Sequence, residues 1–260
     1  DDRAEFTVIA EEFLDTARAA KSLAYQAAAH FFLFMLRLAQ TDLPDAIEQM
    51  RLAMSTATSG RLGQLAIVLM SFSAVLEVLR GNLDAAEIIY AALTAQLVGA
   101  GIPAGADFHV LSDVCLGWHR GSIAPIADDL AAIYARAPRT VAWTQVIALL
   151  DTGRVDEARA LAESDPPISR DYYWTGNQAF HARALIRLGM VEEARQLYDE
   201  LLPWSGSIAG LDAASVAFDP MDLLLADLAE LVGESEQAAR HRELAREVSA
   251  KVARDLAGIG

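Results

Sequence analysis

The sequence predicts an all-α protein, a superhelical solenoid of about six helical hairpins. Three observations point to this fold. Hydrophobic residues make up 53% of the 260 residues, and they recur mostly at the spacing of an amphipathic helix. The 16 glycines and 8 prolines fall mostly between these periodic segments. A short turn motif recurs along the chain, and two amphipathic helices joined by such a turn cannot bury their apolar faces without similar neighbours.

The clearest hairpin covers residues 182–203, with its turn at Gly189. Glycine accepts the left-handed conformation that ends a helix. The acidic pair Glu192 and Glu193 then falls in the first turn of the next helix, where negative charge stabilises the positive end of the dipole. Ala194 allows two helices to approach closely, and Tyr198, four residues later, returns to the same face. We expect Ala194 and Tyr198 to pack against neighbouring helices.

The same order of a turn residue, acidic residues and alanine recurs with spacings of 40, 40, 32, 36 and 44 residues. Irregular spacing near this length is typical of helical-hairpin repeats with variable loops. Twelve residues before the motif's alanine, a second small residue indicates a close helix crossing in three copies. The turn positions are Thr41, Gly81, Gly121, Gly153, Gly189 and Gly233, and the paired small residues are Ala74 with Ala86, Ala182 with Ala194, and Ala226 with Ala238.

The periodic segments predict one repeat domain over residues 1–260, with a possible bend at the glycine-rich loop of residues 99–105. The chain begins without methionine inside an expected helix, so we expect a fragment of a longer protein. Helices are expected at residues 2–20, 22–40, 43–58, 62–80, 82–99, 106–120, 123–136, 139–152, 154–164, 171–188, 190–202, 212–232 and 234–257.

Charge and cysteine content exclude several classes of function. The formal net charge of -15 and the pI near 4.7 argue against nucleic-acid or anionic-membrane binding, both of which require clustered Lys and Arg. The single cysteine, Cys115, cannot form an internal disulfide and fits a reducing cytoplasm. The most apolar run, residues 31–36, is too short to span a bilayer.

The sequence shows no catalytic motif. It lacks a phosphate-binding loop and the common zinc-protease and serine-hydrolase motifs. Cys115 and His119 stand one helical turn apart, but without a third ligand they favour a buried pair over a metal site. Adjacent carboxylates such as Asp128 and Asp129 point about 100° apart on a helix, so they fit solvated helix starts better than acid–base catalysis. We therefore expect no enzyme activity, no catalytic or metal-binding residues and no cofactor.

The aromatic run of residues 172–174, together with Trp204, follows the Pro166-Pro167 break. It could form the edge of a groove, although core packing between repeats is the more common role of such residues.

The motif of a small residue, Gly, an acidic pair, Ala and an aromatic resembles the tetratricopeptide repeat over nearly the whole chain. The order of five further segments resembles the C-terminal helical region of bacterial STAND-type regulatory ATPases. That group includes LuxR-type and antibiotic-regulatory transcription activators, and class III adenylate cyclases with ATPase and repeat regions. The segments are residues 139–143, 150–159, 170–174, 197–204 and 238–241. The stretch between Trp204 and Asp222 matches poorly, and no DNA-binding helix-turn-helix follows Ala257.

The resemblance implies that the first helix of each hairpin faces a concave groove. The chaperone-tail clamp of similar repeats is absent, because Phe31 and Met35 occupy its first-repeat positions. An apolar or amphipathic guest would suit the aromatic middle of the groove, and Arg183 and Arg187 are expected to be available for an anionic group. The expected groove residues for a ligand or partner are Phe108, Cys115, Trp118, His119, Trp143, Arg183 and Arg187.

The leading hypothesis is a non-catalytic sensor and interaction domain of a cytoplasmic bacterial transcriptional regulator. It would bind a small-molecule effector or a partner protein or peptide in the groove, and it would contact the ATPase and output domains of the parent protein. Direct contact with nucleic acid or membrane is not expected. The alternative is a scaffold or dimerisation domain of a cyclase or ATPase without a small-molecule ligand, and this alternative leaves homo-oligomerisation open.

Overall fold

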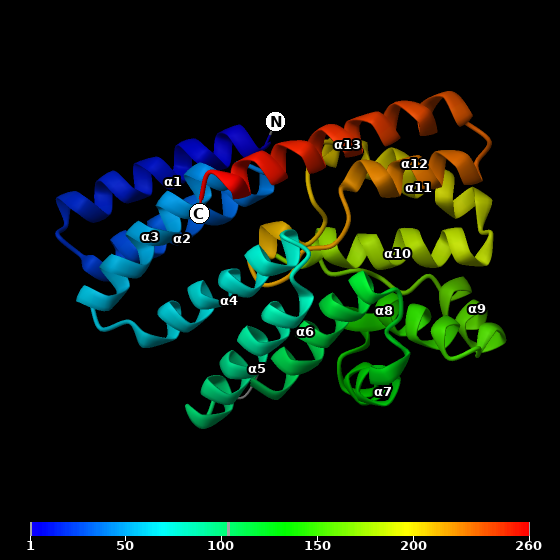
Figure 1. Cartoon of the computed structure of the whole chain (residues 1–260), viewed down its shortest axis with the longest axis horizontal. Helices are drawn as coiled ribbons and strands as arrows, with labels where there is room; N and C mark the ends of the chain where they lie inside the picture. The colour runs from blue at the N-terminus through cyan, green and yellow to red at the C-terminus, as the bar shows by residue number, and fades with distance from the viewer. Residues whose placement is uncertain (1, 103–104, 260) are drawn as a thin grey trace.

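The computed structural model describes residues 2–102 and 105–259, apart from the side chains of residues 2–4, 63, 64 and 66–68. This part of the chain is an all-α helical repeat solenoid without strands (Figure 1). The α-helices are α1 (Asp2–Ala19), α2 (Leu23–Ala39), α3 (Leu43–Ser59), α4 (Gly63–Leu79), α5 (Leu83–Gly99), α6 (Gly105–Arg120), α7 (Ala127–Arg136), α8 (Pro138–Asp151), α9 (Val155–Glu163), α10 (Trp174–Leu188), α11 (Val191–Leu201), α12 (Met221–Leu231) and α13 (Ser235–Ala257).

Left-handed residues end the helices at a regular spacing in the first half of the chain. Helices α2 to α5 are each 17 residues long, and a three-residue turn follows α2, α3 and α4. All six turn positions expected from the sequence have a positive φ, so the repeat register is confirmed. The turn residues at 20-residue intervals are Lys21, Thr41, Arg61, Gly81, Gly101 and Gly121, with φ between 52° and 87°.

The hairpins stack as the small residues predict. Helix α8 contacts α10, and α10 contacts α12, so the first helices of successive hairpins line up. Ala182 and Ala194 have no exposed surface, and Tyr198 is 8% exposed. The other two alanine pairs of the motif are also fully buried. Close helix crossings at these positions are therefore confirmed.

The last helix returns to the beginning of the chain. Helix α13 contacts α3 and α4, and Figure 1 shows it crossing toward the N-terminal hairpin. The Lys251 ammonium group donates a hydrogen bond to the Thr41 carbonyl. Val252 and Leu256 of α13 join the apolar core of α2, α3 and α4. The two ends of the solenoid are thus packed together.

Residues 205–220, which we call the inner segment, connect α11 to α12 through the middle of the superhelix (Figure 1). The expected helix over residues 212–232 is wrong in its first half, since α12 begins only at Met221. Pro220 disfavours helix at the residue before it, and Gly206, Gly210 and Ala214 adopt left-handed conformations. Only a 3-10 turn over Leu211–Ala213 and one bridge between Ile208 and Pro220 give the inner segment regular structure.

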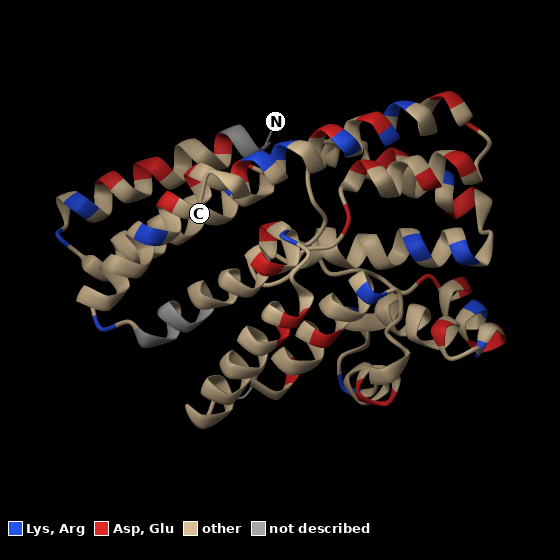
Figure 2. Cartoon of the chain, in the orientation of Figure 1, with Lys and Arg blue, Asp and Glu red and all other residues tan. Residues whose placement is uncertain are grey.

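Charged side chains are unevenly distributed over the solenoid. Helix α13 carries acidic and basic residues along its whole length, whereas α5 shows few charges (Figure 2). Exposed apolar side chains occur instead on the N-terminal hairpin, where Phe6, Ile9 and Phe32 are each at least half exposed. The surface is therefore rich in charge at α13 and more apolar at α1 and α2, where Phe6, Ile9 and Phe32 line a cavity.

Candidate functional site

The inner segment occupies the concave side of the superhelix, where side chains from five helices hold it. Ser71 of α4 donates a hydrogen bond to the Ala214 carbonyl at 3.3 Å. Tyr90 of α5 donates to the Ser215 carbonyl at 2.8 Å. The Tyr90 hydroxyl is buried, and this burial raises its pKa well above the usual value. The carbonyl groups of an irregular segment are thus satisfied by the solenoid, as buried backbone requires.

Cys115, Trp118 and His119 of α6 all contact the inner segment. The Cys115 thiol and the His119 Nε2 each donate to the Ala217 carbonyl, at 3.4 and 2.8 Å. Cys115 has no exposed surface, and its burial raises the pKa of the thiol to about 11. The Trp118 indole N–H donates to the Asp219 carboxylate at 3.1 Å. The inner segment covers Cys115, so direct contact between Cys115 and a guest would require the segment to move. Trp118 is nearly buried but lines a cavity beside α10, and His119 remains exposed.

Arg183 and Arg187 both have carboxylate partners. Arg183 lies over the Trp118 ring and forms an ion pair with Asp219 at 3.0 Å. Arg187 forms an ion pair with Asp151 at 2.5 Å. The expectation that the two arginines are available for an anion is therefore wrong in this conformation. They border a cavity of about 450 Å³ whose charges are already compensated.

Trp143 lies on α8 outside the contacts that hold the inner segment. Its indole N–H donates to the Pro166 carbonyl at 3.0 Å, and its ring stacks on His181 at a centroid distance of 3.8 Å. Trp143 is only 3% exposed. Burial lowers the pKa of His181 to about 4, so the imidazole is neutral at physiological pH. The structure therefore places Trp143 in the packing between α8 and α10.

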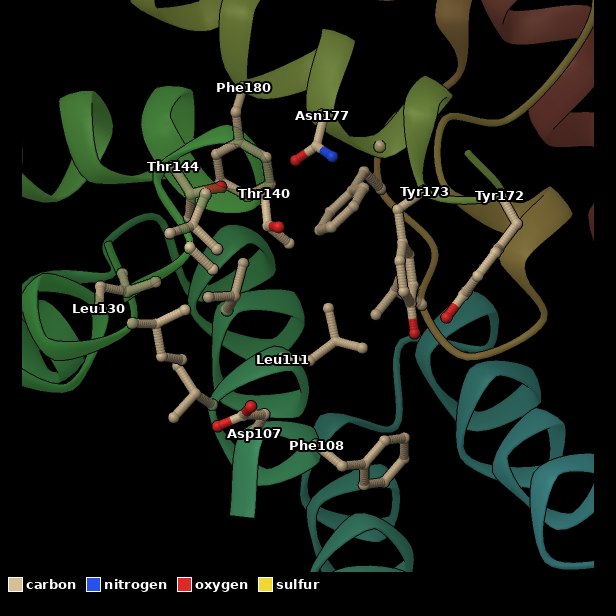
Figure 3. A pocket seen from close by; sticks show the side chains of 18 of the residues that line it. Asp107, Phe108, Leu111, Leu130, Thr140, Thr144, Tyr172, Tyr173, Asn177 and Phe180 are labelled. Carbon is tan, nitrogen blue, oxygen red and sulfur yellow. The ribbon is translucent and has the colours of Figure 1, made fainter. Parts of the chain in front are cut away.

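Phe108 lines two cavities, neither of which Trp118, Arg183 or Arg187 borders. It lines a cavity of about 540 Å³ between α6, α7, α8 and α10, and also a second cavity of about 1000 Å³ beside α1 and α2. Tyr172 and Tyr173 line both cavities as well. Figure 3 shows Phe108, Tyr172 and Tyr173 along one side of the smaller cavity. The aromatic run after the double proline thus forms the edge of a hollow, while Trp174 is buried in the core.

The lining of the two cavities is mainly apolar. Burial raises the pKa of Tyr173 to about 12, and its hydroxyl lies 3.1 Å from the Ser215 hydroxyl. Asp212, in the wall of the larger cavity, accepts a hydrogen bond from Thr175 at 2.5 Å. Burial raises the pKa of Asp212 to about 6. These groups are engaged with the inner segment or belong to it, so the hollow is suited to apolar guests.

A hydroxyl, an imidazole and a carboxylate lie in series at the start of the inner segment. The Tyr198 hydroxyl is 3.0 Å from His241 Nε2, and His241 Nδ1 is 2.7 Å from Asp222. Asp222 also accepts from the Ser205 hydroxyl and the Gly206 amide. None of these residues lines any of the three cavities described above. The series anchors the inner segment to the α12–α13 hairpin, where Tyr198, His241 and Asp222 are all buried.

Among the described residues, no three His, Cys, Asp or Glu side chains come together as a possible metal site. Within the same residues, no helix is both long enough and apolar enough to cross a bilayer.

The fold defines a helical-repeat domain. The tetratricopeptide repeat family model matches residues 140–164 and 178–200, which cover α9 and α11 and most of α8 and α10. The chain therefore contains a tetratricopeptide repeat region, and repeats of this kind suggest a protein–protein interaction module. No curated protein and no solved structure gives a significant match to the chain.

Sequence reasoning missed the other half of the site, the inner segment itself. Asp219 and Ala217 contact the candidate residues Trp118 and Cys115, and Ser215 contacts Tyr90 of α5, but the inner segment belongs to no repeat. A signal was present, because Asp219-Pro220 and two glycines interrupt an otherwise helix-forming stretch. A loop that belongs to no repeat has no periodic sequence pattern. Its position relative to the repeats therefore cannot be predicted from the sequence.

Proposed function

We propose that this chain is a non-catalytic sensor and interaction region of a bacterial signal-transducing regulator, and that its guest occupies the hollow beside the inner segment. One observation carries the proposal. The two cavities adjoin on the concave side, and both are lined by Phe108, Tyr172 and Tyr173. The order of sequence segments that resembles the STAND-type regulatory ATPases supports the regulator context, with ATPase and output domains as further partners in a cytoplasmic protein.

The nature of the hollow favours an apolar or amphipathic guest. Covering apolar surface stabilises a complex by about 25 cal/mol per Å² removed from water. Tyr172 is 58% exposed although it borders both cavities, so a guest could cover a large apolar area there. Anion binding at Arg183 and Arg187 is less favourable, because a guest would have to displace Asp219 and Asp151.

A thermal-shift screen of metabolites, run beside light-scattering measurements of molar mass, tests this proposal. We expect at least one compound to raise the melting temperature of the wild type. Tyr172→Ala should reduce that shift without changing the melting temperature of the unliganded chain, because the side chain is largely exposed. Ile88→Ala is the matched control, since Ile88 is 72% exposed and lines neither cavity. Stabilisation that Tyr172→Ala leaves intact would contradict the assignment to this hollow.

The alternative function is a protein scaffold or dimerisation domain without a small-molecule ligand. The observation that favours it is the apolar surface of the N-terminal hairpin, where Phe6, Ile9 and Phe32 are each at least half exposed. Exposed apolar patches of this kind mark interaction surfaces. A molar mass that rises with concentration, together with no stabilisation by any metabolite, would favour the scaffold. Phe32→Ser should then restore the monomer mass.

A further inference from the structure

The cavity between α6, α7, α8 and α10 is the smaller of the two cavities that Phe108 lines. It has the features of a binding site for one kind of small molecule. Its volume of about 540 Å³ lies within the usual range for ligand pockets. Leu111, Leu130 and Phe180 give it apolar walls from three different helices (Figure 3). Val216 and Phe218 of the inner segment complete the lining. The repeats and the non-repeating segment thus enclose the cavity together.

Thr140, Thr144 and Asn177 border this cavity, and their side chains make no hydrogen bond to another described residue. Thr144 is only 4% exposed. Thr140 lies one helical turn earlier on α8 and also lines the cavity. Asn177 of α10 presents its amide toward the same space (Figure 3). Thr140 is exposed and Asn177 is half-buried, so water can reach these groups in the free chain, and an occupant that displaces this water would have to supply hydrogen bonds to Thr144 and Asn177.

The charges around the cavity exclude an ionic occupant. Asp107 and Arg136 are the only ionic side chains among the described residues of its lining. They form an ion pair with each other, and both are about half exposed. The pair therefore lies at the solvent edge and leaves no unpaired charge inside. An ionised guest would lose its hydration without gaining an opposite charge in the apolar interior.

From these contacts we propose that the cavity between α6, α7, α8 and α10 binds a neutral, mainly apolar small molecule, whose single polar group hydrogen-bonds to Asn177 and Thr144. This inference rests on the proposed function, because it specifies the site and the chemical class of the guest. A carbonyl, hydroxyl or secondary amine matches the available groups. The amide of Asn177 can donate and accept, and the hydroxyl of Thr144 can do both.

The test uses N-phenyl-1-naphthylamine, a neutral aromatic amine whose fluorescence increases in apolar surroundings. We expect saturable binding of one molecule per chain to the wild type. Leu111→Trp should weaken binding at least tenfold, because the larger ring fills the cavity. Leu97→Trp is the matched control, since Leu97 lines only the larger cavity, and its affinity should stay within twofold. Equal affinity in Leu111→Trp and wild type, or a loss confined to Leu97→Trp, would overturn the proposal.

Two further measurements test the polar and neutral character of the guest. Asn177→Leu keeps the size of the side chain but removes its hydrogen bond, so affinity should fall roughly threefold to tenfold. This variant also serves if Leu111→Trp does not fold, as circular dichroism would reveal. The anionic probe anilinonaphthalene sulfonate should bind at least tenfold more weakly than the neutral amine. An unchanged affinity in Asn177→Leu, or equal binding of both probes, would refute the proposed chemistry.

These results separate the inference from the proposed function. If metabolites stabilise the chain and Tyr172→Ala abolishes that effect, while Leu111→Trp leaves binding of the neutral amine unchanged, the guest occupies the larger cavity. The proposed function then stands, and the inference about the smaller cavity fails. If the neutral amine binds as expected but no metabolite stabilises the chain and its mass rises with concentration, the cavity assignment stands and the sensor role fails.

Discussion

Asp219 attaches the inner segment to α6 and α10, and its contacts allow the stability cost of losing this attachment to be predicted. The Asp219 carboxylate accepts from both the Trp118 indole and the Arg183 guanidinium. Trp118 is 4% exposed, and the side chains of Arg183 and Asp219 are 30% and 26% exposed. Asp219→Ala would leave a buried N–H and a largely buried cation without a partner. We expect a loss of about 2–4 kcal/mol in the free energy of unfolding, near the lower range for breaking a buried pair.

A double-mutant cycle isolates the ion pair from the other contacts of Asp219. Asp219→Asn keeps an oxygen acceptor for Trp118 but removes the charge, and Arg183→Met keeps most of the apolar stem. We expect a coupling energy of about 1–2 kcal/mol between the two substitutions. Urea unfolding followed by circular dichroism at 222 nm measures each corner of the cycle, because the helical signal reports on the whole solenoid.

The chain offers a matched control for this cycle. Arg170 and Glu200 form an ion pair at 2.9 Å, but their side chains are 75% and 42% exposed. Arg170→Met and Glu200→Gln should therefore show a coupling energy of about 0–0.5 kcal/mol. Equal coupling energies in the two cycles would refute the argument that burial beside Trp118 makes the Asp219 pair strong. Additive effects at Asp219 and Arg183 would refute the ion pair itself.

Three further predictions concern the helices and their turns. Burial lowers the pKa of His181 to about 4, so its contribution to stability is present above pH 6.5 and is lost as the pH falls toward 4. Relative to His181→Phe, the wild type should lose about 2–3 kcal/mol in the free energy of unfolding between pH 7 and pH 4.5. Urea unfolding at each pH measures this difference, and parallel pH profiles of the two proteins would contradict the prediction. Ala194→Leu should cost on the order of 1 to 3 kcal/mol by overpacking a fully buried crossing, and an unchanged melting temperature would show that the site has spare volume. Arg61→Gly should raise the free energy of unfolding by about 0.5–1 kcal/mol, because φ is +57° there. At Gly189 φ is +67°, and a Cβ would meet no atom within 4 Å, so Gly189→Ala should lower the free energy of unfolding by about 1 kcal/mol through backbone strain alone. Effects of the same sign in Arg61→Gly and Gly189→Ala would exclude the backbone explanation.

The repeats could be predicted from the sequence because their signals are local and recur. Gly189 marks its turn directly, and Ala194 marks its helix crossing by size alone. The turns at Lys21 and Arg61 do not carry the glycine motif, because a long side chain and not glycine adopts the left-handed conformation there. The limits of the apolar periodicity indicate their positions, which fit the 20-residue interval between turns.

The inner segment could not be predicted in the same way. Residues 211–217 are rich in alanine and apolar side chains, so local propensity favours the helix that we expected. Hydrogen bonds from Tyr90 and His119 satisfy the carbonyls of this stretch in an irregular conformation, and that tertiary context overrides the propensity. The repeat pattern places Trp118 and Arg183 on the inner surface. It contains no information about the inner segment, whose Asp219 contacts both residues.

The return of α13 to the start of the chain has a consequence for folding. In an open solenoid each repeat contacts only its neighbours, so the terminal repeats can fray independently of the rest. Here Lys251 hydrogen-bonds to the Thr41 carbonyl, and Thr41 in turn donates to the Gly206 carbonyl of the inner segment. Contacts that span 210 and 165 residues link both ends to the middle. We therefore expect the array to unfold as a single cooperative unit with a high contact order, and hydrogen exchange at its two ends to be governed by the same global opening.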